Sequence, residues 1–187
     1  MKTYGEKMLP ILEDLENPDI ELAGGSTVGM ILSITDSLLI YICNKTIGKK
    51  KYENVQDEVI EIKNEAQNLK KRAIEIVDED RNVLKKILEA YRNRKQNAEM
   101  YDEVCKESVK FCIETLEEGI KTLNLSKKLE KVGNKLLESD FKICKKYANA
   151  AIAASIENIE INLKSVSDEK FKNEARKKYI KNKNTME

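Results

Sequence analysis

The amino-acid sequence predicts an all-α protein folded as a single domain. Among its 187 residues only seven are Gly and two are Pro, and no stretch rich in Gly, Ser or Pro separates two halves. Apolar residues recur at helical spacing along most of the chain, whereas the alternating pattern of strands is scarce. We therefore expect one antiparallel bundle of six or seven helices over residues 1–187, which dimerises through helices of small side chains.

The N-terminal part of the chain contains two predicted helices. The first covers residues 4–15 and ends at the turn sequence Asn-Pro-Asp of residues 17–19. The second follows the Gly-Gly-Ser of residues 24–26, and Asp36 is the only charged residue in its apolar run 28–43. This run is shorter than the roughly 20 apolar residues of a membrane span. We expect instead a helix buried on nearly all sides, which packs against its own bundle and against a second subunit.

The middle of the chain has helical spacing over two long runs. Residues 52–94 predict a long helix with a break or kink at the acids 78–80, because neighbouring like charges repel. Apart from a functional role, these acids are typical of a solvated turn or of the first turn of a new helix. A further helix is predicted over 97–123, and a short one over 126–132 that the Gly-Asn pair 133–134 ends.

The C-terminal part opens with a helix of unusually small side chains. Ser139 is its predicted N-terminal cap, and Asp140 is favoured by the helix dipole. Five alanines follow: Ala148, Ala150, Ala151, Ala153 and Ala154. A hydroxyl and two amides then share one helical face, where they either pair across a helix interface or hold a ligand: Ser155, Asn158 and Asn162. Asp168 is the predicted cap of a last, basic helix that ends near residue 183.

Composition and charge exclude several kinds of chemistry. The 34 basic and 33 acidic residues nearly cancel, so we expect no binding to nucleic acid or to an anionic membrane. The chain has no histidine, which removes the commonest general base and zinc ligand, and we expect no metal. A carboxylate whose pKa is raised by burial is the best remaining acid or base. The four cysteines form no C-x-x-C pair and we recognise no secretory leader, which predicts free thiols in the cytoplasm.

Three blocks of sequence have the order and spacing of one protein family. The first, residues 23–52, begins Ala-Gly-Gly-Ser and ends Gly-Lys-Lys-Lys-Tyr, and the second, residues 76–91, runs from IVDED to Ala-Tyr. The third, residues 133–163, joins Gly-Asn and Ser-Asp to the alanine-rich helix ending ENIEINL. Together they resemble the cyclodeaminase/cyclohydrolase family, which includes the C-terminal domain of formiminotransferase-cyclodeaminase and the stand-alone methenyltetrahydrofolate cyclohydrolases.

The resemblance implies an all-helical homodimer with folate bound in a cleft near the subunit interface. The substrate would be a tetrahydrofolate derivative, held without a metal. Asp80 and Asp140 match acids in the family's blocks and are implied to act in acid–base catalysis or to stabilise a cation, although either is also a possible helix cap. The folate-binding positions implied by the same blocks are Gly24, Gly25, Ser26, Asn134, Ser139, Asn158 and Asn162. Asp36 is unusual in this setting, since a buried lone acid pairs, takes up a proton or lies in a functional cavity.

Two reactions are expected of such a site. The leading expectation is a methenyltetrahydrofolate cyclohydrolase, which hydrolyses 5,10-methenyltetrahydrofolate to 10-formyltetrahydrofolate. The first alternative is a formiminotetrahydrofolate cyclodeaminase that releases ammonia, and the second is a non-catalytic helical dimer of the same fold. A membrane-associated protein anchored by residues 22–43 is a further alternative.

Overall fold

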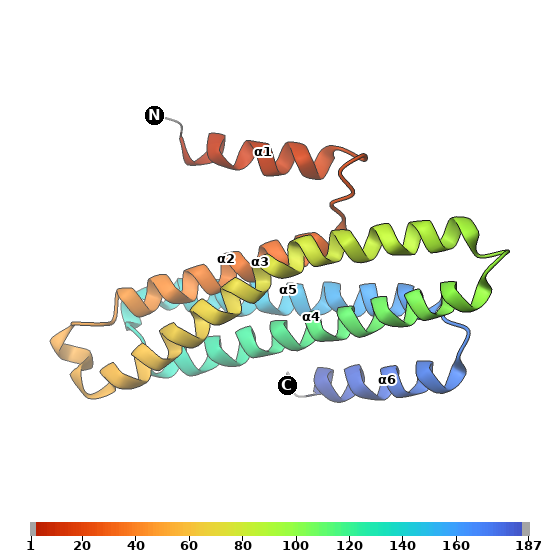
Figure 1. Ribbon diagram of the computed structural model, residues 1–187. Coiled ribbons are helices and arrows are strands. Elements are labelled where there is room, and N and C mark those ends of the chain that lie inside the picture. Colours follow the sequence, from red (N-terminus) through yellow and green to blue (C-terminus); the bar gives the residue numbers. More distant parts are fainter. Residues whose placement is uncertain (1–2, 185–187) are drawn as a thin grey trace.

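The protein is an all-helical bundle (Figure 1). The computed structural model describes the backbone of residues 3–184 and the side chains through Lys181. Its elements are α1 (Tyr4–Glu16), α2 (Gly24–Asn44), the 3₁₀ helix η1 (Lys50–Val55), α3 (Gln56–Asn93), α4 (Ala98–Val132), the 3₁₀ helix η2 (Lys135–Leu137), α5 (Glu138–Leu163) and α6 (Glu169–Asn184). Because these residues contain six α-helices and no strand, the predicted all-α class is confirmed.

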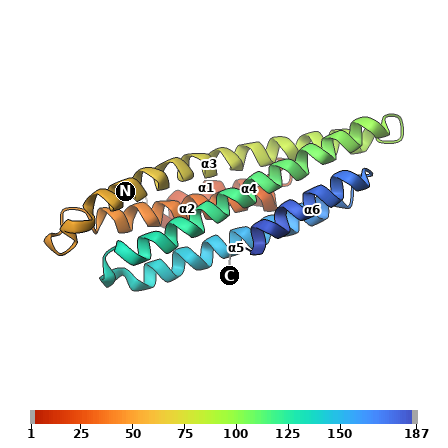
Figure 2. The same cartoon turned by 90° about the horizontal axis from the view of Figure 1, so that it is seen from below.

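Helices α2 to α5 run up and down beside one another, and α6 lies along the same bundle (Figures 1 and 2). Three apolar clusters fill its interior. One lies towards η1 and η2 and includes Leu39, Ile42, Leu125, Leu129 and Phe141. A middle cluster comprises Val28, Leu32, Ala73 and Ala151. A third joins α4, α5 and α6 and includes Val109, Leu116, Ile152, Ile159 and Tyr179. Each fully buried Leu or Ile stabilises the fold by roughly 1.5–3 kcal/mol.

Helix α1 stands away from the bundle (Figure 1). It forms where the sequence predicts it, and a capping box between Thr3 and Glu6 satisfies its first N–H groups. None of its residues is buried in the single chain, and most of its apolar side chains are exposed. Those exposed side chains are Tyr4, Met8, Leu9, Ile11 and Leu12.

Helix α2 is only partly covered in a single chain. Its inner face is buried, but Ile34 and Tyr41 are 51% and 45% exposed. Among the described residues it is the one helix long and apolar enough to cross a membrane, and half of its most apolar window is buried in the bundle. The expectation that a second subunit covers the remainder stays a prediction.

Helices α2 and α3 approach closely at Gly29. A Cβ atom at this position would lie 2.8 Å from the carbonyl oxygen of Ala73 and 3.0 Å from Cγ2 of Val77. Because the nearer obstacle is backbone, it cannot rotate away as a flexible side chain would. Only glycine allows this helix crossing.

Replacement of Gly29 by Ala is therefore expected to destabilise the bundle. We expect a loss of about 1–3 kcal/mol from overpacking, which the better helix propensity of Ala offsets by at most about 1 kcal/mol. Urea unfolding followed by circular dichroism measures the change. The matched control is Gly5→Ala in α1, where a Cβ meets nothing within 4 Å. An equal midpoint for the two variants would contradict the close helix contact.

Two helices are continuous where the sequence predicted an interruption. The expected break at residues 78–80 is wrong, because α3 continues through it. Successive side chains point in different directions around a helix, so Asp78 faces solvent, Glu79 forms a bidentate pair with Arg72 at 2.6 and 2.8 Å, and Asp80 turns towards α2. The separate short helix 126–132 is also wrong, since α4 is continuous to Val132.

Of the two predicted N-terminal caps in this region, that of α5 is wrong and that of α6 is confirmed. Ser139 does not cap α5, which begins at Glu138 directly after η2; it lies exposed in the first turn. The cap in this region is Asn134, whose Oδ1 accepts a hydrogen bond from the Leu136 N–H at 3.2 Å at the start of η2. The predicted cap Asp168 is confirmed, because its Oδ1 accepts from the Phe171 N–H at 3.0 Å.

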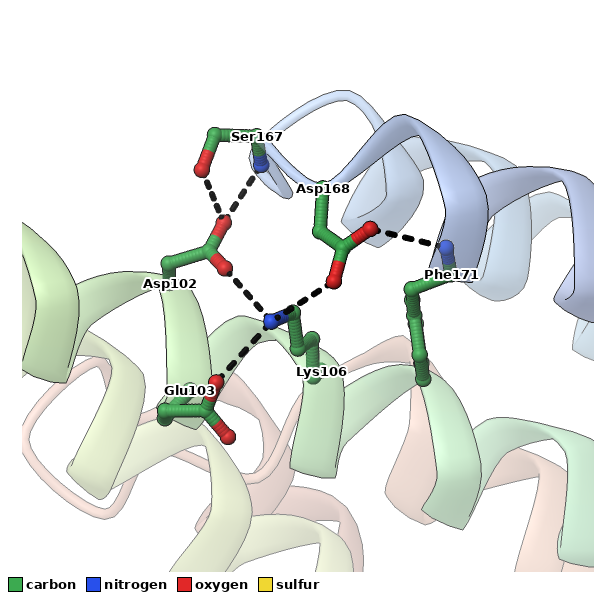
Figure 3. A network of polar contacts seen from close by, with 6 residues as sticks. All are labelled: Asp102, Glu103, Lys106, Ser167, Asp168 and Phe171. Carbon is green, nitrogen blue, oxygen red and sulfur yellow. Dashed lines mark hydrogen bonds and ion pairs between the residues drawn. The ribbon is translucent and has the colours of Figure 1, made fainter.

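A charged cluster fixes the start of α6 to α4 (Figure 3). The Lys106 Nζ lies 3.0 Å from Asp102, 2.9 Å from Glu103 and 3.2 Å from Asp168. Oδ1 of Asp102 accepts hydrogen bonds from the backbone N–H and, at 2.6 Å, from the hydroxyl of Ser167. Burial alone would raise the pKa of Asp102, but the bonds from Ser167 and Lys106 outweigh it and lower this pKa to about 2.

The cluster predicts that the docking of α6 weakens in acid. The pKa of Asp102 is lower in the folded chain than in the unfolded chain, so its stabilisation is complete above pH 4 and is lost as the pH falls towards 2. Allowing for solvent screening, we expect Asp102→Asn to cost about 1 kcal/mol at neutral pH and to remove this acid dependence. Hydrogen exchange of α6 peptides at several pH values measures how firmly α6 is docked. Asp57→Asn, on the exposed face of α3, is the control and should behave as the wild type. If Asp102→Asn exchanged at the wild-type rate at every pH, the proposed role of Asp102 in holding α6 would be contradicted.

Candidate functional site

A pocket opens where the start of α2 meets α3, α4 and α5. Its volume is about 190 Å³. Polar groups on its wall come from Gly24, Gly25, Asp80, Cys112, Asn158 and Asn162. Its apolar wall consists of Ala23, Val83, Leu84, Ile87 and Ile161. Concave sites of this kind, mostly apolar with a few convergent polar groups, are the usual sites of small-molecule binding.

The carboxylate of Asp80 is pressed against the first turn of α2. The Ser26 hydroxyl donates to Asp80 Oδ2 at 2.9 Å and also lies 3.1 Å from the Val77 carbonyl oxygen. A Cβ atom on Gly25 would lie 1.9 Å from Asp80 Oδ1, so only glycine admits the acid at this place. The N–H groups and positive end of a helix dipole favour a negative charge here.

The environment of Asp80 shifts its proton affinity in the direction that a general base requires. Burial raises the pKa of Asp80, and the hydroxyl and backbone hydrogen bonds from Ser26 offset part of that rise. The net result is a pKa above the ordinary value of an aspartate. A carboxylate with a raised pKa takes up a proton more readily, as a general base must.

Helices α4 and α5 supply the other polar groups of the pocket. The Asn162 amide donates to the Cys112 sulfur at 3.4 Å. Burial raises the pKa of Cys112 to about 12, so this thiol is neutral and unreactive while it stays buried. Ser155 lies deeper and donates to the carbonyl oxygen of Ala151 in its own helix.

A small extension of the pocket lies beside Asp80. It measures about 10 Å³ and is bordered by Gly25, Asp80, Phe111, Cys112, Thr115, Ser155 and Asn158. This is about the volume that one water molecule requires, and a hydroxyl, an amide and a carboxylate on its border are suitable hydrogen-bond partners. The arrangement can therefore hold a single water against the acid.

Comparison with known proteins identifies the family. The sequence matches the model of the formiminotransferase-cyclodeaminase family over residues 8–181. The chain belongs to this family. No curated protein matches the sequence. A solved structure, the formiminotetrahydrofolate cyclodeaminase of Thermotoga maritima, has the same fold with a TM-score of 0.89 and 20% sequence identity, over 99% of this chain and 90% of that one. The resemblance noted in the sequence is thus confirmed, and at this identity the structural likeness concerns the fold alone.

In this member of the formiminotransferase-cyclodeaminase family, most of the predicted site residues come together. The pocket wall contains Gly24, Gly25, Asp80, Asn158 and Asn162. Ser26 is fully buried directly behind the wall and contacts Asp80. The folded chain therefore brings residues of all three sequence blocks to one place.

The remaining predicted residues lie elsewhere on the single chain. Ser139 and Asp140 are in the first turn of α5, whereas Asn158 is near its other end. The axial separation between Asp140 and Asn158 is about 27 Å at 1.5 Å per residue. Neither Ser139 nor Asp140 lines the pocket, so their role in folate binding or catalysis stays a prediction.

Asn134 is engaged in holding the end of the bundle together. Its side-chain amide donates to the Lys45 carbonyl oxygen at 3.1 Å, and its backbone N–H donates to the Thr46 hydroxyl at 3.0 Å. The Tyr52 hydroxyl lies 3.4 Å from its Oδ1 and accepts a hydrogen bond from the Lys135 N–H at 3.0 Å. Within one chain these contacts join the connection after α2 to that between α4 and α5.

Several pocket residues were not recognised in the sequence as part of a site. These are Val83, Leu84 and Ile87 of α3 and Cys112 of α4. A signal was present, because positions 80, 83, 84 and 87 form one stripe on a helix. A stripe that begins with a carboxylate and continues with apolar residues is consistent with the lining of a pocket.

Proposed function

We propose that the protein is a folate-dependent enzyme, a methenyltetrahydrofolate cyclohydrolase that converts 5,10-methenyltetrahydrofolate to 10-formyltetrahydrofolate. The observation that carries the proposal is Asp80, held by Ser26 and Gly25 at the start of α2 beside a space for one water. Membership in the formiminotransferase-cyclodeaminase family supports the choice of a folate as substrate.

The pocket is suited to the flat ring system of the substrate. Its volume of about 190 Å³ is small for a whole folate, so we place the pterin inside and the remainder along the surface. The amides of Asn158 and Asn162 offer donors and acceptors to the edge of the ring. The apolar side chains of Leu84 and Ile87 then contact the ring faces.

In the proposed reaction Asp80 accepts the proton of the attacking water. The water oxygen forms a bond to the bridging carbon of the methenyl cation as its proton passes to the Asp80 carboxylate. Asp80 then returns that proton to N5 as the C–N5 bond breaks. The carbinol O–H releases a second proton, which leaves a formyl group on N10. The carboxylate also stabilises the positive charge of the substrate before water adds.

A second candidate is the formiminotetrahydrofolate cyclodeaminase reaction. The similar solved structure is described as such an enzyme. In this reaction N10 attacks the formimino carbon and ammonia leaves, so Asp80 would take a proton from N10 and supply one to the departing amine. A non-catalytic dimer of the same fold is the third candidate, and it predicts no turnover of either substrate.

One pair of assays separates these candidates. Purified protein is mixed with methenyltetrahydrofolate, and the decay of its near-ultraviolet band is compared with the uncatalysed decay in the same buffer. The formimino substrate is assayed in parallel for released ammonia. Accelerated decay supports the cyclohydrolase, ammonia release supports the cyclodeaminase, and folate binding without either supports the non-catalytic protein.

We also propose that the protein acts as a homodimer in the cytoplasm. The outward face of α2 carries no charged side chain, and α1 leaves most of its apolar side chains exposed in its own chain. Two copies joined through antiparallel α2 helices would bring the Asn134–Asp140 end of one copy towards the pocket of the other. Sedimentation equilibrium tests the dimer, and a monomer at all concentrations would oppose it. The four free cysteines are consistent with a reducing compartment.

A further inference from the structure

Asp36 lies inside the bundle with one carboxylate oxygen unpartnered. Only 1% of the residue is exposed, and its Oδ1 accepts a hydrogen bond from the Thr122 hydroxyl at 2.9 Å. In the described part of the chain, Oδ2 of Asp36 is the one buried side-chain polar atom without a hydrogen-bond partner. Buried carboxylates normally accept several hydrogen bonds or pair with a cation. The site therefore accommodates the neutral acid better than the anion.

The groups around Asp36 do not compensate a negative charge. Helix α2 has no other charged residue, α4 presents Thr122 and the like charge of Glu118, and α5 presents the buried thiol of Cys144. Burial, with additions from Asp140 and Asp36, raises the pKa of that thiol to about 12, so it is neutral. No described hydrogen bond or ion pair joins Asp36 to α3. Burial raises the pKa of Asp36 itself to about 7. The hydrogen bond from Thr122 lowers this pKa in part, and the negative charge of Glu118 raises it further.

We propose that Asp36 is a proton-operated latch that seats α2 against α4 and α5 while its carboxyl carries a proton and loosens this contact when the proton is lost. The neutral carboxyl keeps its bond with Thr122 and leaves no charge in the core. The anion needs water or a cation around Oδ2, which it reaches only when α2 moves away from its neighbours.

A movement of α2 at Asp36 would also change the pocket, because both lie along α2. Gly25 and Ser26, which hold Asp80, are about three turns before Asp36 on the same helix. Cys112 of α4 faces them across the pocket. Loosening α2 from α4 separates these walls, so the pocket opens as the pH rises through neutrality. The inference is independent of the folate reaction.

The first test is stability as a function of pH. An acid whose pKa is raised in the folded state favours folding at low pH and opposes it above that pKa. With a folded pKa of about 7 and an ordinary unfolded value, the unfolding constant should rise about 30-fold more in the wild type than in Asp36→Asn between about pH 5.5 and 8.5. Urea unfolding at each pH measures this ratio.

The second test reports on the pocket itself. Cys112 is 6% exposed, and its alkylation by iodoacetamide, located by peptide mass spectrometry, follows opening of the pocket wall. At each pH the alkylation rate of the wild type is divided by that of Asp36→Asn. The effect of pH on the reactivity of the thiol is common to both proteins and cancels in this ratio. We expect equal rates near pH 5.5 and a several-fold faster rate in the wild type near pH 8.5.

Control variants and the contrary results complete the design. Asp57→Asn, at an exposed site, should retain the wild-type pH dependence, and Asp36→Leu should replace Asp36→Asn if the latter does not fold. An equal pH dependence of stability in the wild type and the Asp36 variants, or a Cys112 ratio of one at every pH, would overturn the latch. If neither variant folds, ¹³C NMR of the assigned wild-type carboxyls decides, because the latch requires Asp36 itself to titrate near neutrality.

Discussion

Asp80→Asn is expected to lower kcat for methenyltetrahydrofolate hydrolysis by about 10²–10⁴-fold, the range for loss of a general base. The amide has nearly the shape of the carboxylate but cannot take a proton from water. Because proton transfer to Asp80 occurs only in the transition state, kcat should fall by this factor, whereas KM should rise only by the smaller amount that the lost attraction to the substrate cation costs. Steady-state decay of the near-ultraviolet band measures both constants.

The pH profile gives an independent check on Asp80. A general base must be ionised, so kcat/KM should fall as the pH drops through the pKa of Asp80, which burial places above the ordinary aspartate value. Asp78→Asn is the matched control, since Asp78 is exposed two residues away on the same helix. If Asp78→Asn lost as much activity as Asp80→Asn, or if Asp80→Asn retained full activity, the assigned role of Asp80 would be wrong.

The helices were predictable because the helical spacing of apolar residues is visible within each segment of the sequence by itself. Residues 4–15 and the run that became α2 needed no knowledge of their neighbours, and Asp168 capped the last helix as its position indicated. The break at residues 78–80 failed for a local reason as well. Adjacent acids point in different directions around a helix, and Arg72, two turns earlier, pairs with the middle one.

The pocket was only partly predictable, because periodicity does not say which helices are neighbours. The contact between Ser26 and Asp80 joins residues far apart in sequence, and only the family's blocks indicated that they belong together. The same blocks placed Asp140 with Asp80, whereas the length of α5 separates Asp140 from the pocket amides by about 27 Å in one chain. Spacing along a sequence gives the face of a helix but not its partner.

Gly25→Ala is expected to displace the Asp80 carboxylate. A Cβ atom would lie 1.9 Å from Oδ1 and 2.5 Å from Cγ of Asp80, closer than any non-bonded contact allows. Either the carboxylate turns away and loses the Ser26 hydroxyl, or α2 moves off α3. We expect a loss of about 1–3 kcal/mol in unfolding free energy and a fall in kcat of about 10²-fold from the misplaced base.

A double-mutant cycle distinguishes this clash from a general effect of alanine at the start of α2. In the Asp80→Ala background the atoms that Cβ would meet are gone, so Gly25→Ala should cost little stability there. The coupling energy from urea unfolding of the four proteins should therefore approach the whole cost of the single variant. Equal costs in both backgrounds would mean that Gly25 is required by the backbone alone, and that Asp80 is positioned by Ser26 without help from the glycine.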